Sequence, residues 1–238
     1  MKNEELRYKQ LRKLGQELHI PIPEAFWELE VFDQEGKLIR RHKQRSHSWV
    51  RNAYNLLFCQ LAGKAPSDSD YGPGKLNAKE TSGTVRYGTG TLSITGRYLN
   101  SPDGTEYGYR APAAVDARGS MVGSGTADES FEDYALQTKI ANGTGAGQLS
   151  YIQSEANSMT YDAANKILKN TLIRYFNNNS GGDVSVNEVG LVWYSYRPDS
   201  SNYNAFYLAS RDKLAATVTV PNTGQLKVTY TIQLTYPA

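Results

Sequence analysis

The chain has 238 residues, with 26 basic and 24 acidic side chains and a single cysteine, Cys59. A chain of this length buries roughly 70% of the surface that its unfolded form exposes, so we expect a hydrophobic core in one or two domains. The single cysteine excludes an intrachain disulfide, and the nearly balanced charge provides no overall field that would attract nucleic acid. We expect neither a membrane segment nor a signal peptide, because no long apolar run follows the charged N-terminus.

The choice of side chains favours β-structure. The sequence contains 17 tyrosines and 21 glycines but only three histidines. Tyrosine and threonine suit half-buried pleated surfaces, whereas Gly, Asn and Ser interrupt them, so the composition predicts a mainly β protein. Surfaces rich in tyrosine also favour contacts with other molecules.

The N-terminal segment is predicted to be a helix over residues 3–19. Leu11, Leu14 and Leu18 follow the spacing i, i+3, i+7, which places a narrow apolar stripe on an otherwise charged helix. Two prolines in the sequence HIPIPE then end the helix. We therefore expect residues 1–22 to form a helical extension or arm, which docks either on its own body or on a neighbouring subunit.

A hairpin and a second helix are expected next. In residues 26–43, Trp27, Leu29 and Val31 alternate with glutamates before the turn DQEG, a pattern typical of a β-hairpin. Residues 48–62 are predicted to form a core helix packed against a sheet, with a serine cap at the start and Gly63 at the end. The apolar face expected for this helix consists of Trp49, Val50, Ala53, Tyr54, Leu57, Phe58 and Leu61.

Residues 64–83 are poor in apolar side chains and rich in Pro, Gly, Ser and Asp, which predicts a long surface loop. Loops of this length in a compact body usually bind something, and an arm that reaches an adjacent subunit would fit. Residues 84–110 are predicted to contain further strands.

The second half of the chain predicts a strand-built body. Residues 165–176 fit a helix or a strand by periodicity; β-branched and aromatic side chains favour a strand, and the corner Asn177–Asp183 suits a hairpin. Short β-patterned runs follow at 184–196, 204–212, 216–221 and 225–236. The expected fold is mainly β, a β-sandwich or jelly-roll-like body over residues 23–238 with one packed α-helix and the N-terminal helical extension.

The strongest candidate for chemistry is the acidic cluster Asp128, Glu129, Glu132 and Asp133. Two carboxylates can act as acid and base on a glycosidic bond, and several can hold a calcium ion. The spacing matches no EF-hand loop, and the neighbouring Phe131 and Tyr134 favour an exposed turn with two aromatic contacts. The turn is preferred here over a metal site and over a catalytic site.

Other patterns provide no catalytic, metal or cofactor site. The sequence NGTGAGQ lacks the Gly-Lys-Ser/Thr ending of a phosphate loop, and no HExxH or GxSxG motif occurs. His19, His42 and His47 are scattered. Arg211 and Asp212 are predicted to fix a strand corner by a charge-assisted hydrogen bond, and Glu188 to be a hydrogen-bonded strand residue. We therefore expect a protein that is not an enzyme.

The C-terminal third resembles a module of structural proteins of tailed bacteriophages. The resemblance rests on RYFNNNSGGDVSVNEVGL, on an Arg-Asp corner and on a final predicted hairpin in ATVTVPNTGQLKVTYTIQL. With VFDQEGKLIRRHKQRSHSWVRNAYNLL and ESFEDYALQTKIANGTGAGQLSY, it covers about three quarters of the chain. Within RYFNNNSGGDVSVNEVGL, the motif R-x-F-x-N-x-S-G is matched by Arg174, Phe176, Asn178, Ser180 and Gly181.

The resemblance implies a virion component that is made in the host cytoplasm and contacts copies of itself and other virion proteins. The balanced charge and the lack of a long apolar run predict neither nucleic acid nor a membrane as a partner. The residues expected at such contacts are Leu11, Leu14, Leu18, Tyr71, Tyr107, Tyr109 and Tyr203. A receptor- or carbohydrate-binding module, in which exposed tyrosines stack on a host-surface glycan, is the alternative. A glycan hydrolase built on Asp128, Glu129 and Glu132 is the third hypothesis.

Overall fold

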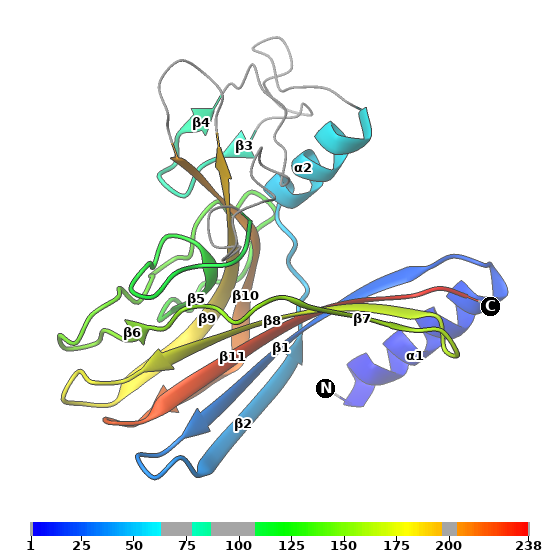
Figure 1. Ribbon diagram of the computed structural model, residues 1–238. Helices are drawn as coiled ribbons and strands as arrows, with labels where there is room; N and C mark the ends of the chain where they lie inside the picture. The colour runs from blue at the N-terminus through cyan, green and yellow to red at the C-terminus, as the bar shows by residue number, and fades with distance from the viewer. Residues whose placement is uncertain (1, 63–77, 87–107, 197–203, 238) are drawn as a thin grey trace.

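A computed structural model describes residues 2–62, 78–86, 108–196 and 204–237 of the chain. Two antiparallel sheets lie face to face, with a helix on either side of the larger one (Figure 1). The expected mainly β, sandwich-like fold is therefore confirmed.

The large sheet has the strand order β2-β1-β11-β8-β6, and β7 also pairs with β8. Its strands are β1 (Ile22–Phe32), β2 (Leu38–Arg45), β6 (Ser150–Tyr151), β7 (Ser158–Asp162), β8 (Ile167–Asn177) and β11 (Gln225–Thr235). The hairpin expected at residues 26–43 is confirmed as β1 and β2. In the segment 165–176, which fits helix or strand by periodicity, residues 167–176 belong to strand β8.

The small sheet has the order β10-β9-β5. Its strands are β5 (Gly119–Gly123), β9 (Val184–Tyr196) and β10 (Asn204–Val220). Two short strands, β3 (Ala78–Lys79) and β4 (Val85–Arg86), form a separate pair at the end of the segment expected to be a loop. Residues 63–77, which make up most of that expected loop, and 87–107, where more strands were expected, lie outside the described residues.

The core lies between the two sheets. Trp27, Leu29 and Val31 alternate along β1 as predicted, and all three are completely buried. Trp27 packs against Tyr230 of β11 with 4.0 Å between ring centroids, and Trp193 of β9 packs against Tyr207 of β10 at 5.4 Å. Each pair lies within one sheet, and all four side chains belong to the same buried core cluster. The burial of such large side chains is the main stabilising contribution to the fold.

The corner at Asn177–Asp183 is confirmed as a bend, but the expected hairpin is wrong. It joins β8 of the large sheet to β9 of the small sheet, so the chain crosses from one layer to the other. The second predicted hairpin, between β10 and β11, is the same kind of crossing. The two corners are hydrogen-bonded to each other: Asn178 N donates to Gly224 O at 2.9 Å, and Thr223 N donates to Asn178 O at 2.8 Å.

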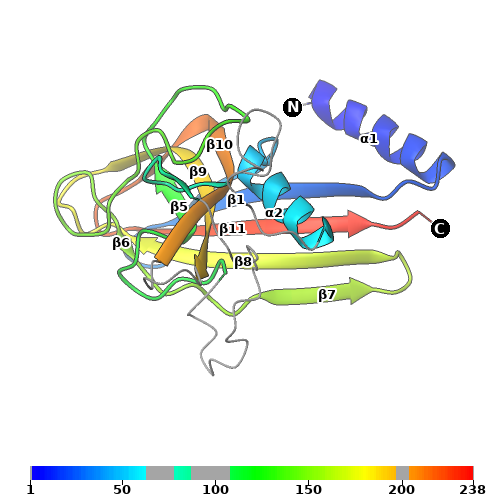
Figure 2. The same cartoon turned by 90° about the horizontal axis from the view of Figure 1, so that it is seen from above.

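The large sheet extends beyond the small one. In Figures 1 and 2 the ends of β1, β11 and β8 and the whole of β7 project past β9 and β10. We call this part the overhang; it comprises residues 22–25, 232–235, 167–170 and 158–162, which are paired in register. One face of the overhang continues the core face of the sandwich, because side chains at every second position point to the same side.

The two helices are α1 (Lys2–Glu17) and α2 (Arg51–Ala62). Helix α2 packs against β10 and β3, as the expected packed helix, and of the expected apolar face Val50 is completely buried and Ala53 packs on the core. Its buried side chains are Asn52, Asn55 and Leu56, whereas Tyr54, Leu57 and Phe58, expected in the core, are 39%, 48% and 49% exposed. The side chains of Cys59 and Leu61 lie outside the described part of the helix.

Candidate assembly surfaces

Helix α1 lies against the outer face of the large sheet, next to β1 (Figure 1). Gly15 is buried there, and a Cβ atom at that position would lie 2.5 Å from Ile22 Cδ1. Tyr8 covers the guanidinium of Arg45 at 3.9 Å from the ring centroid. The absence of a side chain at Gly15 therefore allows the helix to approach β1 closely, one turn away from Arg12.

Four charged side chains close a ring between α1, β1 and β2, which we call the arginine–glutamate ring. Arg12 donates to Glu24 at 2.9 Å and to Glu5 at 3.0 Å, and Arg45 donates to Glu24 at 2.5 Å and to Glu5 at 3.0 Å. The side chain of Glu24 is only 1% exposed. Hydrogen bonds from Arg45 and Arg12 hold the pKa of Glu5 below its usual range. A helix held by ion pairs of this kind is docked mainly through polar contacts.

Leu11, Leu14 and Leu18, which we call the leucine stripe, do not take part in this docking. They are 45%, 50% and 57% exposed. A surface helix normally turns its apolar side to the core. Here the polar side faces the sheet, and the leucine stripe is left open to other molecules.

The tyrosines expected at loop tips do not form a described surface. Tyr71, Tyr107 and Tyr203 lie outside the described residues. Tyr109 packs on the core beside Trp193, with 6.3 Å between ring centroids, and burial raises its pKa. Tyr109 is therefore a partly buried side chain that packs on the core and not an exposed aromatic loop tip.

A second apolar surface, which sequence reasoning missed, lies between α2 and the overhang. A hollow of about 260 Å³ is lined by Pro23, Ala25 and Ile232 of the large sheet and by Trp49, Tyr54 and Leu57 on the side of α2. Its remaining lining residues are the polar Glu24, Ser46 and His47. The strand register continues the same sheet face toward β7. We call the whole surface the apolar groove: its floor is Pro23, Ala25, Met159, Tyr161, Leu168, Ile232 and Leu234, with the polar Asn170 between Ile232 and Met159, and its wall is Tyr54, Leu57 and Phe58.

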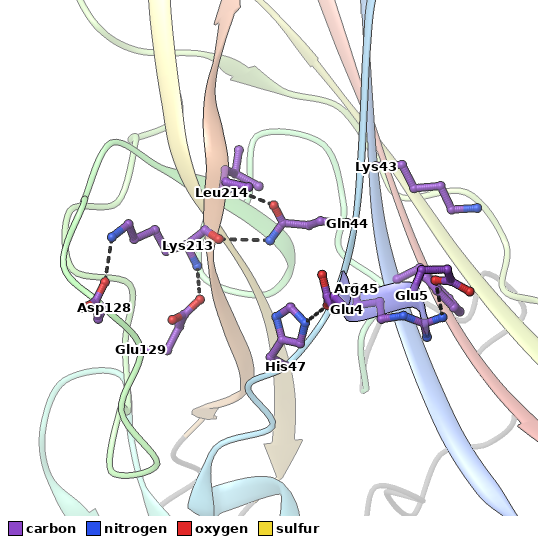
Figure 3. Close-up of a pocket in the computed structure, with 12 residues that line it drawn as sticks. Glu4, Glu5, Lys43, Gln44, Arg45, His47, Asp128, Glu129, Lys213 and Leu214 are labelled. Atoms are coloured by element: carbon purple, nitrogen blue, oxygen red, sulfur yellow. Dashed lines mark hydrogen bonds and ion pairs between the residues drawn. The ribbon is translucent and has the colours of Figure 1, made fainter. Parts of the chain in front are cut away.

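A larger hollow of about 510 Å³ lies between the start of α1, β2 and β10 (Figure 3). Its charged groups pair with each other: His47 Nε2 lies 2.7 Å from Glu4, and Lys213 Nζ lies 2.6 Å from Asp128. Gln44 joins β2 to β10 by donating to Lys213 O at 2.9 Å and accepting from Ala215 N at 2.9 Å. These contacts close one side of the sandwich.

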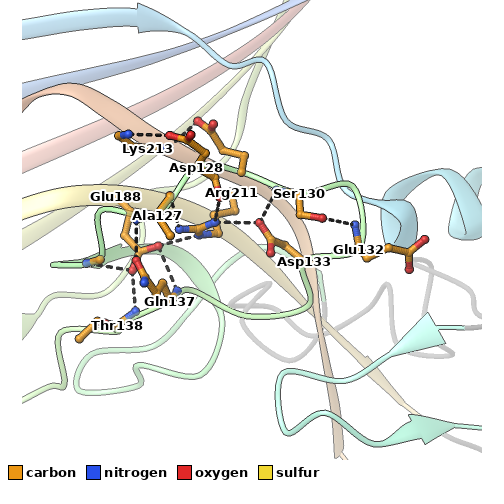
Figure 4. Close-up of polar contacts among 12 residues, drawn as sticks. Ala127, Asp128, Ser130, Glu132, Asp133, Gln137, Thr138, Glu188, Arg211 and Lys213 are labelled. Atoms are coloured by element: carbon orange, nitrogen blue, oxygen red, sulfur yellow. Dashed lines mark hydrogen bonds and ion pairs between the residues drawn. The ribbon is translucent and has the colours of Figure 1, made fainter.

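The acidic cluster is held in place by several different partners (Figure 4). Asp128 accepts from Lys213 Nζ, and Glu129 accepts from the backbone N of Lys213 at 2.7 Å. The other two carboxylates face arginines, Glu132 at 3.2 Å from Arg51 and Asp133 at 2.8 Å from Arg211. Within the described ranges, no three His, Cys, Asp or Glu side chains gather in a way that could hold a metal ion. The four carboxylates therefore attach a turn to α2 and β10 by ion pairs and hydrogen bonds.

Glu188 is a hydrogen-bonded strand residue, as predicted. It is completely buried and accepts hydrogen bonds from the backbone N of Gly125, Gln137 and Thr138, at 3.2, 3.0 and 2.7 Å. Arg211 Nε also donates to it, at 2.7 Å. Glu188 therefore attaches the 124–138 loop to the small sheet.

The predicted pairing of Arg211 with Asp212 is wrong, because adjacent residues of a strand point to opposite faces. Arg211 turns to Glu188, whereas Asp212 turns to the other side and accepts from Trp27 Nε1 at 2.8 Å and from Ser46 Oγ at 2.6 Å. Burial raises the pKa of the Asp212 carboxyl. Both residues lie within β10 and not at a corner.

Arg174, the first residue of the motif that carries the phage resemblance, is completely buried. Its guanidinium donates to backbone carbonyls of the segment 112–120 and of Ile152, the distances to Arg118 O and Ile152 O being 2.8 and 2.9 Å. Desolvation by burial lowers the pKa of Arg174 to about 10. Phe176 fills the core and Asn178 the corner, so these motif residues have structural roles.

None of the helices in the described part of the chain has the length and apolar character needed to cross a membrane. Comparison of the chain with protein-family models, with curated proteins and with solved structures finds no match.

Proposed function

We propose that this chain is a non-enzymatic structural component of a tailed-bacteriophage particle, in the head or the tail, and that it acts through repeated contacts with copies of itself and with other virion proteins. It is made in the host cytoplasm and ends in the virion. The observation that carries the proposal is the exposed leucine stripe on a helix that is docked through its polar side. Apolar surface of this kind marks a protein interface.

The buried motif residues support the same function. Arg174 binds backbone carbonyls of a distant loop, and Asn178 binds those of its own corner and of the end of β10. Glu188 binds loop amides from the small sheet. Their polar atoms are used in holding loops and corners, as expected of a rigid building block that offers its outer surfaces to neighbours. The order of these motifs along the chain is the basis of the resemblance to phage structural proteins.

A receptor- or carbohydrate-binding module of a phage tail or fibre is the second candidate. It is favoured by Tyr161 and Tyr236, which are 64% and 57% exposed. Exposed aromatic rings offer flat faces on which a sugar ring can stack. Binding to a glycan array by a protein that stays monomeric would favour this candidate over self-assembly.

The proposal is tested by removing residues 1–20. Strand β1 begins at Ile22, and Glu24 keeps its contact with Arg45 when α1 is absent, so we expect the truncated body to stay folded. Self-association should weaken by at least about tenfold for each leucine that leaves an interface. Light scattering over a micromolar concentration series measures the association, and circular dichroism checks the fold.

The triple variant Leu11→Gln, Leu14→Gln, Leu18→Gln should weaken association as the truncation does. The matched control is Lys9→Gln with Lys13→Gln, which changes two exposed polar residues of the same helix. A wild-type protein that stays monomeric throughout the series would contradict the proposal. So would global unfolding of the truncated chain, because α1 would then belong to the core.

A further inference from the structure

We infer that the apolar groove receives the leucine stripe of a second copy, so that copies of this chain join head to tail. This inference rests on the proposed function and names the two surfaces that meet. It commits to one occupant, helix α1 of the neighbouring copy.

The floor of the groove is the part of the large sheet's core-facing side that the small sheet does not cover. Trp27, Tyr230 and Leu172 stand side by side in the register and are at most 5% exposed, because the small sheet covers them. Further along the same face, Met159 and Leu168 are 67% and 44% exposed. Apart from Asn170, the apolar pattern continues where the small sheet has ended, so this part of the sheet is suited to being covered.

The wall of the groove is the unused side of α2. The helix packs on the body through Asn52, Asn55 and Leu56, and it turns Leu57 and Phe58 outward. Tyr54 and Leu57 line the same hollow as Ile232 of the floor. The wall and the floor therefore form one continuous surface.

The exposed area is large enough for a specific contact. The most exposed members of the groove are Tyr54, Leu57, Phe58, Met159, Tyr161 and Leu168. Given the size of such side chains, their open surface amounts to roughly 600 Å². This reaches the top of the range for the largest apolar patch of a typical monomer, about 300–600 Å². It approaches the ~800 Å² that each partner contributes to a standard interface.

The dimensions suit a helix. The overhang is four strands wide and four to five residues long, which corresponds to a floor of roughly 15 by 15 Å. An α-helix with its side chains is about 10 Å across, and the distance from Leu11 to Leu18 along the axis is about 10 Å. An amphipathic helix in an apolar groove, anchored at i, i+3 and i+7, is a common mode of recognition.

The placement of the two surfaces requires two copies. Helices α1 and α2 lie on opposite sides of the large sheet (Figures 1 and 2). The groove lies on the core side together with α2, because Tyr54 and Leu57 line its hollow. The docked α1 therefore cannot fill the groove of its own chain. A contact between two different surfaces is heterologous, and repetition of it gives a ring or a filament.

A mixing experiment tests the inference. The groove variant carries Leu57→Glu and Met159→Lys, two exposed positions whose substitution the fold should tolerate. The stripe variant carries glutamine at positions 11, 14 and 18. Each variant alone should be monomeric, with association at least about 100-fold weaker than in the wild type. Mixed in equal amounts, they should form a one-to-one pair and nothing larger, because one intact stripe meets one intact groove.

Sedimentation velocity with a fluorescent label on one variant distinguishes the outcomes. As a control, Ile39→Lys, at an exposed apolar position of β2 outside the groove, should assemble as the wild type does. A groove variant that still assembles overturns the inference and leaves the proposed function standing. A stripe variant that assembles alone, while the groove variant does not, shows a groove-to-groove contact and also overturns it.

A groove variant that melts at a lower temperature than the stripe variant shows a groove filled within its own chain, and this too overturns the inference. A wild-type protein that is monomeric at all concentrations contradicts both the inference and the proposed function.

Discussion

Glu188 of β9 and Arg211 of β10 form an ion pair inside the protein, with 2.7 Å between Glu188 Oε2 and Arg211 Nε. Their side chains are 0% and 3% exposed. Gly125 makes room for the carboxylate, since a Cβ atom there would lie 2.5 Å from Glu188 Oε1. The pair thus joins two strands of the small sheet to the loop that carries the acidic cluster.

Replacing Glu188 with Gln should destabilise the protein strongly. The substitution keeps the shape of the side chain but leaves Arg211 with Asp133 as its remaining carboxylate partner. Removing one partner of a buried ion pair costs about 3 kcal/mol in the free energy of unfolding. Urea unfolding measures the change, and Arg211→Met in the Glu188→Gln background should cost less than it does in the wild type, because the two residues act together.

Glu132→Gln is the matched control, because Glu132 also faces an arginine but is 65% exposed. Its loss should change the free energy of unfolding by less than about 1 kcal/mol. Equal effects of Glu188→Gln and Glu132→Gln would show that the pair between β9 and β10 is open to solvent.

Asn178 holds the two crossings between the sheets together, so Asn178→Ala should loosen both. Its side-chain NH₂ group donates to Gly182 O at 2.8 Å and to Val220 O at 2.9 Å, and its side-chain oxygen accepts from Ser180 N at 3.0 Å. Asn178 is completely buried. Alanine leaves the buried carbonyl of Val220 without this partner, which should cost about 1–3 kcal/mol in the free energy of unfolding.

Thermal unfolding measures the loss at Asn178, and hydrogen exchange at Thr223, whose amide donates to Asn178 O, reports whether the second corner opens. Asn179→Ala, at the exposed neighbouring position, should have little effect on either. If the two alanine variants behave alike, the corners are not coupled through this side chain.

The bend at Asn177–Asp183 could be predicted from the sequence, but the sheet that the following strand joins could not. Asn and Gly at a corner are a local signal, because they tolerate the backbone angles of tight turns. Which sheet the next strand joins depends on a partner far away in the chain. Strand β8 pairs with β11, about fifty residues later, and the small sheet forms only when β10 reaches β9.

The leucine stripe shows the same contrast between a local pattern, which can be predicted, and contacts with distant residues, which cannot. The spacing of Leu11, Leu14 and Leu18 predicts one apolar side of a helix, and that side exists. The docking side could not be predicted, because the ring joins Glu5 and Arg12 to residues of two strands, and no local pattern relates them. The opposite directions of Arg211 and Asp212, by contrast, follow from the alternation of any strand and could have been predicted.

The arginine–glutamate ring should make the docking of α1 depend on pH in a defined direction. Hydrogen bonds from Arg45 and Arg12 lower the pKa of Glu5 from its usual value of 4.5. A carboxyl whose pKa is lowered in the docked state stabilises that state above its ordinary pKa, and the contribution is lost as the pH falls through the lowered value. The helix should therefore stay docked at neutral pH and loosen in acid, below 4.5.

Carbon NMR of the Glu5 carboxyl measures its midpoint, which we expect below 4.5 in the wild type. Arg45→Gln should move the midpoint back toward 4.5, whereas Lys9→Gln, an exposed substitution on α1 outside the ring, should leave it in place.

Tyr8 lies 3.9 Å from the Arg45 guanidinium, so its ring current shifts the Arg45 side-chain protons. That shift should diminish over the same pH range, because protonation of Glu5 weakens the contact that keeps Tyr8 beside Arg45. A Glu5 midpoint at 4.5 in the wild type would mean that the ring does not hold the helix in solution.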